Sequence, residues 1–250
     1  MKISGCAAIV TGGCQGIGRG IVYALLRKNA KVAVLDINDV AGKELESKLR
    51  KEFGNDMACY THCDVSNKNQ LTDAFQNVRR KFNGLHIVVN NAGTMNPDCD
   101  IGVDVNLKSV IRGTMLGIEM MDKNSGNDGG AIVNIASMSG LVPLSLGPVY
   151  TATKAGVIAF TRCYKAAAQE LRVRVNCVCP VFVEGTDMVN ESIAASSLFQ
   201  NITEKVGFVT VNMVADAVVK TIEDDTLAGK VVTVTPESGI KTFTFPKAKF

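Results

Sequence analysis

The sequence contains no tryptophan and only two histidines, His62 and His86. It also lacks two Cys-x-x-Cys pairs, so a zinc ion would find few of the ligands that it prefers. We therefore expect no metal site. The stretch from Ser137 to Lys154 can hold an acid–base apparatus without a histidine, a thiol or a metal.

Charge and long apolar runs are also scarce. The net charge is only +3, and the Lys and Arg residues are dispersed, which argues against a nucleic-acid surface and against a polybasic membrane patch. No apolar run reaches the ~18 residues that a membrane-spanning helix needs. The opening MKISGCAAIVTGG enters a strand-like run without a separate apolar leader, so we expect no secretory signal and no membrane span.

Cysteine is present eight times, but its placement argues against a disulfide framework. Four cysteines lie in apolar strand-like runs, where small buried thiols are common: Cys6, Cys59, Cys177 and Cys179. We expect free thiols, a reducing environment and a cytoplasmic location.

Length and hydrophobic content, 250 residues and 46%, predict one α/β domain over residues 1–250. Apolar runs alternate with helix-periodic stretches, which is typical of a parallel sheet covered on both faces. We expect strands near Cys6–Val10, Lys31–Asp36, Met57–His62, His86–Asn90, Ala131–Ala136, Val173–Val178 and Lys230–Thr235. Helices are expected near Gly16–Lys28, Val40–Phe53, Lys68–Phe82, Val103–Met121, Val149–Leu171 and Val211–Asp224. The pattern predicts a single doubly wound (Rossmann) seven-stranded parallel sheet.

The first expected turn, TGGCQGIG from Thr11 to Gly18, separates a strand from a helix. Gly12 suits a sharp turn, Gly16 lets a pyrophosphate approach the backbone, and Gly18 lets the helix lie close to the sheet. A plain glycine-rich turn is the alternative. The position between the first strand and the first helix favours a dinucleotide site.

Polar residues follow the next three expected strands. Asp36 ends the second strand about 20 residues after the glycine turn, where a carboxylate accepts hydrogen bonds from an adenosine ribose and repels a 2′-phosphate. It can also serve the start of the next helix, with Asn38 or Asp39 as the cap. Asp64 follows the third strand and Asn90–Gly93 the fourth, so the strand ends together predict one extended NAD site.

Tyr150 and Lys154 are one helical turn apart, which places the lysine ammonium beside the phenol. A neighbouring cation favours phenolate and lowers the phenol pKa from its usual ~10, towards the range where a general base works. The pair alone is weak evidence, since Tyr-x-x-x-Lys arises by chance at ordinary lysine usage. Ser137, at an expected strand end, can orient a substrate oxygen.

Residues 181–208 alternate large apolar side chains with Ser, Asn and Glu. Such a segment can close over an apolar substrate, although an ordinary amphipathic helix covering the core is the alternative. No cation precedes Lys205 in it, so a substrate carboxylate would lack an evident partner there.

Taken together, these motifs resemble those of the short-chain dehydrogenase/reductase family over nearly the whole chain. The match runs in family order through TGGCQGIG, Asp36, Asp64-Val65, NNAG at Asn90–Gly93, Asn106 in VNL, Ser137 and the Tyr150/Lys154 pair. Within the family, the chain is most similar to NAD-dependent 15-hydroxyprostaglandin dehydrogenases, with insect-type alcohol dehydrogenases as neighbours. It departs from them in Pro180-Val181 in place of Pro-Gly, a short segment 94–103, and Gly147 in place of a glutamine.

The resemblance implies a role for each matching residue. Tyr150 would be the general acid/base, Lys154 would hold the nicotinamide ribose, Ser137 would position the substrate oxygen, and Asn106 would hold a water. The implied cofactor-binding residues are Gly12, Gln15, Gly16, Ile17, Gly18, Asp36, Ile37, Cys63, Asp64, Val65, Asn91, Ala92, Gly93, Tyr150, Lys154, Val183 and Thr186. The implied substrate residues are Ser137, Leu144, Gly147, Tyr150 and Phe182.

Three functions remain open on the sequence. The first is an NAD-dependent oxidoreductase that acts on a small apolar secondary alcohol or ketone. The others are an NADPH-dependent carbonyl reductase, which Asp36 disfavours, and a catalytically idle dinucleotide-binding sensor or scaffold, which the intact catalytic set disfavours. The helices near Val103–Met121 and Val149–Leu171 carry small and apolar residues on more than one face, which favours a homodimer or homotetramer.

Overall fold

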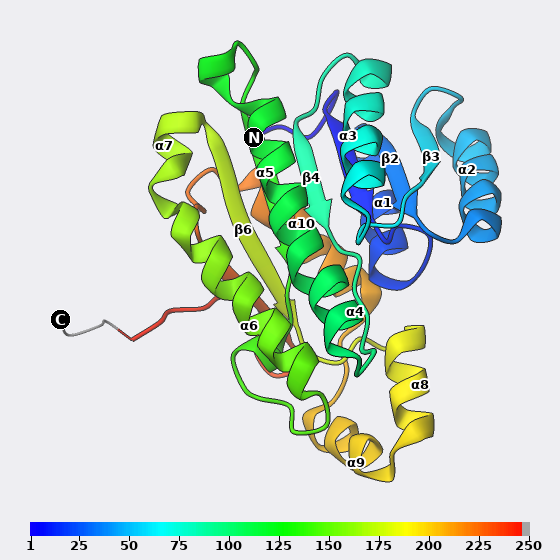
Figure 1. The fold of residues 1–250 in the computed structure, drawn as a ribbon, viewed down its shortest axis with the longest axis vertical. Helices are drawn as coiled ribbons and strands as arrows, with labels where there is room; N and C mark the ends of the chain where they lie inside the picture. The colour runs from blue at the N-terminus through cyan, green and yellow to red at the C-terminus, as the bar shows by residue number, and fades with distance from the viewer. Residues whose placement is uncertain (247–250) are drawn as a thin grey trace.

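The computed structural model describes residues 1–246, and an eight-stranded sheet runs through the centre of this part of the chain (Figure 1). The spatial order is β3-β2-β1-β4-β5-β6-β7-β8. The first seven strands pair in parallel, and the last is antiparallel to β7. The strands are Ala7–Thr11 (β1), Lys31–Asp36 (β2), Ala58–His62 (β3), Ile87–Asn90 (β4), Gly130–Ile135 (β5), Val173–Pro180 (β6), Val231–Thr235 (β7) and Gly239–Thr242 (β8).

The central strands are buried along their whole length, because helices cover both faces of the sheet. All five residues of β1 and all eight of β6 are buried. This explains why they read as continuous apolar runs rather than as an alternation of apolar and polar residues. All seven expected strands are present, but the sheet gains an eighth. β8 is short and partly exposed at the edge, so it carries little of the apolar signal that marks the others.

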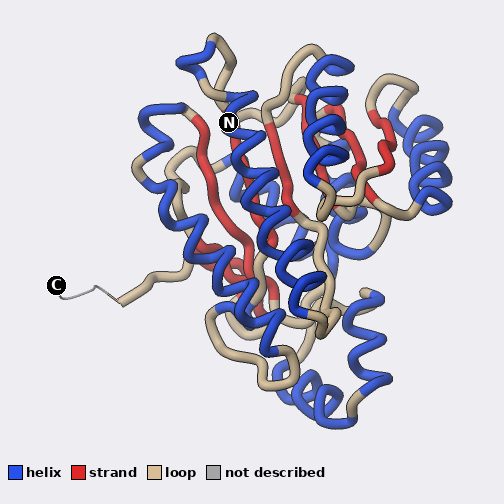
Figure 2. Tube along the Cα trace, viewed as in Figure 1, coloured by secondary structure: helices blue, strands red, loops and turns tan. Residues whose placement is uncertain are grey.

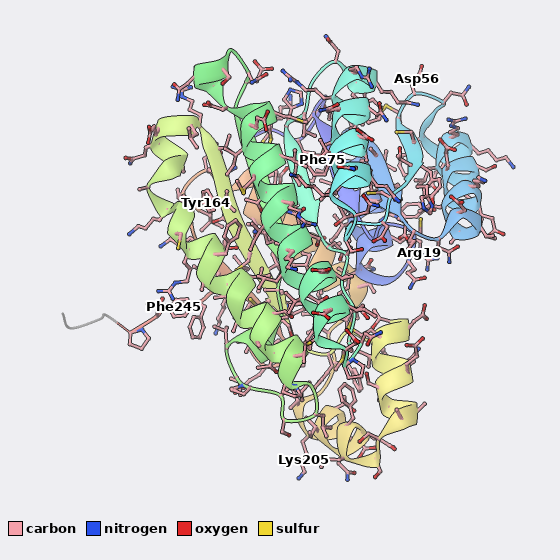
Figure 3. The ribbon with its side chains drawn as sticks, in the orientation of Figure 1. Arg19, Asp56, Phe75, Tyr164, Lys205 and Phe245 are labelled. Carbon is pink, nitrogen blue, oxygen red and sulfur yellow. The ribbon has the colours of Figure 1, made fainter. Side chains whose placement is uncertain are left out.

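The helices are α1 (Gly16–Arg27), α2 (Asp39–Phe53), α3 (Lys68–Phe82), α4 (Cys99–Val103), α5 (Ser109–Met121), α6 (Pro148–Arg162), α7 (Ala167–Leu171), α8 (Asp187–Ala195), α9 (Ser197–Val206) and α10 (Val211–Glu223). Helices α3, α5 and α6 cover the face of the sheet nearest the viewer in Figure 1, and α1 and α10 lie together on the other face. Phe75 of α3 is fully buried between its helix and the sheet (Figure 3). No helix among the described residues is both long and apolar enough to cross a bilayer.

Two helices that were expected to be continuous are interrupted. The stretch from Val103 to Met121 contains a π-helical segment, Asp104–Lys108, between α4 and α5. The stretch from Val149 to Leu171 is divided into α6, a 3₁₀ turn over Cys163–Lys165, and α7. Hydrophobic periodicity is insensitive to such local changes in winding, because the side chains on either side stay close to the same face.

The connections reverse direction between β1 and β4, which are the third and fourth strands in the order of the sheet. From β1 the chain builds outward through β2 and β3, then returns to place β4 on the other side of β1. A crevice therefore opens outside the carboxyl ends of these two strands. Loops gather along this edge, and α8 and α9 project beyond it (Figure 2).

At the opposite end, the side chain of Arg174 terminates α10. Its guanidinium donates to the carbonyls of Thr221, Ile222, Asp224 and Leu227, and it lies 3.1 Å from a carboxylate oxygen of Asp225. The residue is only 9% exposed. One buried cation therefore satisfies several carbonyls that the end of a helix would otherwise leave without donors.

We predict that Arg174→Met lowers the free energy of unfolding by about 2–4 kcal/mol, because it leaves buried carbonyls without donors. Thermal unfolding followed by circular dichroism should show a Tm lower by roughly 5–15 °C. The matched control is Arg50→Met, which removes only a surface ion pair with Glu46 and should change stability by less than about 0.5 kcal/mol. Equal Tm values for the two variants would contradict this role of Arg174.

Candidate active site

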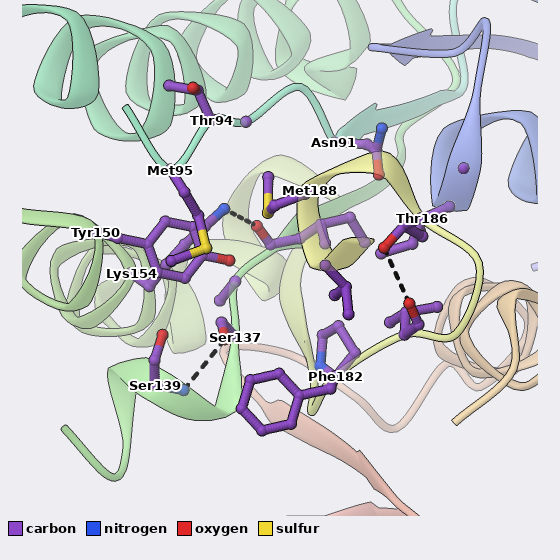
Figure 4. Close-up of a pocket in the computed structure, with 18 of the residues that line it drawn as sticks. Asn91, Thr94, Met95, Ser137, Ser139, Tyr150, Lys154, Phe182, Thr186 and Met188 are labelled. Atoms are coloured by element: carbon purple, nitrogen blue, oxygen red, sulfur yellow. Dashed lines mark hydrogen bonds between the residues drawn. The ribbon is translucent and has the colours of Figure 1, made fainter. Parts of the chain in front are cut away.

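A cavity of about 930 Å³ lies along the carboxyl edge of the sheet. Its walls come from the ends of β1, β2, β4, β5, β6 and β7 and from helices α8 and α9. Tyr150, Lys154 and Ser137 gather on one side of it, with Asn91 and Thr186 towards the other (Figure 4). The cavity is therefore elongated across several strand ends, as one extended ligand would require.

The glycine turn after β1 is tightly constrained. Gly12 has φ +61°, and a Cβ atom there would come within 2.8 Å of the Ala92 backbone. A Cβ atom on Gly18 would lie 2.0 Å from the Gly12 carbonyl oxygen. The turn thus lies against the β4 end with no room for side chains at these positions. Backbone amides at the start of α1 are left facing the cavity, where they can bind a pyrophosphate.

Asn91 and Thr11 join the ends of β1 and β4. The Asn91 side-chain amide donates to the carbonyls of Thr11 and Gly12, both at 2.9 Å. In return, the Thr11 hydroxyl accepts from the backbone N–H of Asn91 at 2.9 Å and of Ala92 at 3.1 Å. These bonds hold the ends of β1 and β4 together at the base of the crevice, where the strand order reverses.

The Asp36 carboxylate lies at one end of the cavity and is held by two backbone donors. One oxygen accepts from Cys14 N–H at 3.0 Å, and the other accepts from Asn38 N–H at 3.1 Å. Asn38 caps α2 through Ala41 N–H, as one of the two expected candidates. Asp36 is thus tied to the glycine turn and to α2, and a carboxylate has further lone pairs for a ligand.

Helix α6 carries Tyr150 and Lys154 on one face, beginning with Pro148 at a position where a missing N–H costs nothing. The Lys154 ammonium lies 5.5 Å from the centre of the Tyr150 ring and donates to the Ile135 carbonyl at 2.9 Å. Ser137 follows β5, and its hydroxyl oxygen accepts from Ser139 N–H at 3.1 Å. The Ser137 hydroxyl also interacts with the phenol of Tyr150, since it acts to lower the pKa of that group.

Burial is the largest influence on the pKa of each member of this pair. It raises the pKa of Tyr150 to about 12, although the Ser137 hydroxyl acts in the opposite direction. It lowers the pKa of Lys154 to about 8. The spacing predicts a lysine beside the phenol, and the structure has it there. Desolvation nevertheless disfavours the charged form of each group, so the lysine alone does not bring the phenol pKa below its ordinary value.

Asn106 lies in the π-helical segment and is 1% exposed. Its side-chain oxygen accepts from Thr94 N–H, and its amide group donates to the Thr94 carbonyl, each at 2.8 Å. A Cβ atom on Gly93 would lie 3.3 Å from the Asn106 oxygen and 3.5 Å from Lys154 Nζ. Asn106 therefore stands close behind Lys154 but does not line the cavity itself.

Comparison with known proteins agrees with this geometry. The family model described as short chain dehydrogenase matches residues 6–197. The chain belongs to the short-chain dehydrogenase family. Human 15-hydroxyprostaglandin dehydrogenase [NAD(+)] is 37% identical over 96% of this chain and 94% of its own, and Comamonas testosteroni 3-beta-hydroxysteroid dehydrogenase is 35% identical over 72% and 71%. The crystal structure of gox2181 matches with a TM-score of 0.82 at 26% identity, covering 92% of this chain and 94% of that one.

Every residue that the family resemblance assigned to cofactor binding lines the cavity of this short-chain dehydrogenase. Val181, which replaces the usual glycine, also lines it, and Thr186 lies close to Gly16, 3.4 Å from where a Cβ atom would stand. The loop after β6 therefore reaches the glycine turn despite its altered sequence.

The residues assigned to the substrate divide differently. Ser137, Leu144, Tyr150 and Phe182 line the cavity, whereas Gly147 does not. Gly147 instead precedes α6, where a Cβ atom would lie 3.4 Å from the end of the Met95 side chain. The cavity wall nearby is formed by Met95 and Leu144.

Sequence reasoning missed several lining residues. Thr235 ends β7, and Pro236 and Glu237 follow it; the rule that ligands lie outside strand ends could have found all three. Met95 and Ile101 line the cavity from the loop after β4 and from α4, and no sequence pattern marks them.

We predict that Lys154→Met makes this short-chain dehydrogenase more stable at pH 7. Because the folded pKa of Lys154 is about 8 against an ordinary 10.5, the cost of burying the ammonium is fully present below pH 8. It disappears as the pH rises towards 10.5. Loss of the hydrogen bond to Ile135 offsets part of the gain. We therefore expect the free energy of unfolding to increase by about 1–2 kcal/mol at pH 7 and by less near pH 10.

Urea unfolding at pH 7 and pH 10 measures this difference. Lys108→Met is the control, since Lys108 is exposed and paired with Asp104 one helical turn away. A Lys154→Met variant no more stable than wild type at pH 7 would show that burial is not the dominant influence on this lysine.

Proposed function

We propose that this short-chain dehydrogenase is an NAD-dependent oxidoreductase that interconverts an apolar secondary alcohol and its ketone. The observation that carries the proposal is the gathering of Ser137, Tyr150 and Lys154 beside a cavity that extends to Asp36. A hydroxyl, a phenol and an ammonium in one place form an acid–base unit. The rest of the cavity offers room and partners for a dinucleotide.

The residues of the cavity fit NAD. Asp36 would accept the adenosine ribose hydroxyls, backbone N–H groups at the start of α1 would bind the pyrophosphate, and Lys154 would hold the nicotinamide ribose. Around Asp36 the lining side chains are neutral or acidic, with Gln15, Ile37 and Asp64 nearby and Lys154 and Lys205 the lining cations elsewhere. A 2′-phosphate would meet a carboxylate without a compensating cation, which supports NAD rather than NADP. NAD supplies the acceptor for the hydrogen that leaves carbon with its electron pair. Relatives named for NAD support the same choice.

The chain supplies the proton chemistry. In the oxidative direction, Ser137 would orient the alcohol oxygen and the Tyr150 phenolate would take its proton; in the reductive direction, the phenol would return it. Lys154 would stabilise the phenolate once it is charged. Asn106, fixed by Thr94 behind Lys154, would hold a water that connects the lysine to solvent.

The far side of the cavity supports an apolar substrate. The lining side chains there are largely aliphatic, aromatic or thioether groups: Met95, Ile101, Val142, Leu144, Phe182, Met188, Val189, Phe199, Ile202 and Val206. Such walls select by shape and apolar contact. Lys205 on α9 also lines the cavity, so hydroxy-fatty and neutral alcohols should be screened side by side with steroid and terpenoid ones.

We further infer that the protein works as a homodimer or homotetramer in the cytoplasm. Met115 on α5 is 58% exposed on the helix layer formed with α6. An apolar side chain there suits contact with a second copy. All eight cysteines are free, as a reducing compartment would keep them. Light scattering at micromolar concentration tests the oligomeric state.

We predict that Tyr150→Phe reduces turnover by about 10²–10⁴-fold on the best alcohol found in a screen with NAD, the usual cost of losing general acid–base catalysis. It removes one oxygen and little volume, so folding and NADH affinity should survive. NADH binding can be followed by its own fluorescence, because the protein has no tryptophan. Near-full turnover by Tyr150→Phe would remove the acid–base assignment and favour the sensor hypothesis.

We predict that Asp36→Ala narrows the preference for NADH over NADPH, because it removes both the acceptor for the ribose and the charge that repels a 2′-phosphate. Fluorescence titration of the variant and the wild type with each nucleotide gives the two ratios of Kd. Asp56→Ala, a change at a surface carboxylate in the loop before β3, is the control. A wild type that binds NADPH as tightly as NADH would rule out the cofactor assignment and favour the NADPH-dependent reductase.

A further inference from the structure

Tyr60 lies outside the cavity, yet its hydroxyl contacts the residue that defines the adenosine end. The hydroxyl is 3.0 Å from the backbone carbonyl oxygen of Asp36 and 2.9 Å from a carboxylate oxygen of Asp39. A phenol has one proton, so it is shared between the two acceptors. Tyr60 thereby joins the edge strand β3 to the end of β2 and to the first turn of α2.

The chain makes specific room for this ring. Gly42 lies within α2, where glycine is normally unfavourable by about 1 kcal/mol. A Cβ atom there would come within 2.2–2.4 Å of three Tyr60 ring atoms. Only glycine fits at position 42, because the Tyr60 ring packs directly against the backbone of α2 there. This packing in turn fixes the position of the Tyr60 hydroxyl.

Asp36 is consequently held at its backbone carbonyl and at both carboxylate oxygens. Its carbonyl accepts from Cys63 N–H at 2.9 Å and from the Tyr60 hydroxyl. Its two carboxylate oxygens accept from Cys14 N–H and Asn38 N–H. The carboxylate lone pairs that remain are available to a ligand. Their direction depends on the position of the Asp36 backbone, which the Tyr60 hydroxyl helps to hold.

We propose that Tyr60 is a positioning residue for the cofactor: through its hydroxyl it holds the Asp36 backbone so that the carboxylate meets the adenosine ribose and opposes a 2′-phosphate. The inference rests on the NAD site proposed above. It assigns nucleotide preference to a side chain that does not touch the nucleotide, and it needs no knowledge of the alcohol.

Tyr60→Phe tests this, because it removes the hydroxyl and keeps the ring over Gly42. We expect NADH binding to weaken about 3–10-fold, the effect of one lost hydrogen bond. NADPH binding should change less, so the ratio of the two Kd values should fall. With any alcohol that is turned over, the KM for NAD should rise while kcat stays within about 2-fold. Tyr23→Phe is the matched control, since this tyrosine packs edge-on against Phe53 in α2.

A double-mutant cycle separates positioning from a general effect on folding. If Tyr60 acts through Asp36, adding Tyr60→Phe to Asp36→Ala should change nucleotide affinity no further. Equal losses in both backgrounds, or an unchanged Kd ratio with a lower Tm, would overturn the proposal. Asp39→Ala gives a second check. It leaves the phenol proton entirely to the Asp36 carbonyl, so NADH should bind as well or better, and a loss equal to that of Tyr60→Phe would also overturn the proposal.

Failure of this inference differs from failure of the proposed function. A wild type that does not bind NADH in the fluorescence titration contradicts the proposed function itself. A wild type that prefers NADH, with a Tyr60→Phe variant that keeps the same affinity and preference, contradicts only the role of Tyr60.

Discussion

The site depends on the junction between β1 and β4. There Asn91 donates to the Thr11 and Gly12 carbonyls, and Thr11 accepts from Asn91 and Ala92. Two parallel strands that diverge into opposite halves of the sheet leave backbone groups without ladder partners where they end. The Asn91–Thr11 bonds satisfy those groups and hold the glycine turn against the β4 end. The relative position of the β1 and β4 ends is therefore fixed before any ligand binds across them.

The elements that position this junction were predictable because they are long and periodic. α3 was expected over Lys68–Phe82 and spans those residues, and each expected strand is present. The eighth strand was not expected, because β8 is short and partly exposed and so lacks a run of buried residues. The π-helical turn at Asn106 was missed for a different reason. It changes hydrogen bonding without changing which residues are apolar.

The candidate site was predictable where chemistry and chain position coincide. Asp36, Asn91 and Tyr150 stand at strand ends or on the first turn of a helix, and such places can be located from the sequence. The apolar wall of the cavity was harder to predict from the sequence, because loops bring side chains such as Met95 to it. Tyr60 shows the limit most clearly. Nothing in the sequence marks a tyrosine on an edge strand as a partner of Asp36, and only the close approach of its ring to Gly42 reveals the arrangement.

The two ends of the cavity are stabilised in opposite ways. At the Asp36 end, the carboxylate is held by two backbone N–H donors, one from the glycine turn at Cys14 and one from Asn38. At the Tyr150 end, desolvation raises the pKa of Tyr150 and lowers that of Lys154, so burial disfavours the charged form of each. The Asp36 end is thus preorganised by backbone hydrogen bonds, whereas charge on Tyr150 and Lys154 carries a desolvation cost. In the function proposed above, the positive charge of an oxidised nicotinamide beside Tyr150 would offset part of that cost and favour the phenolate.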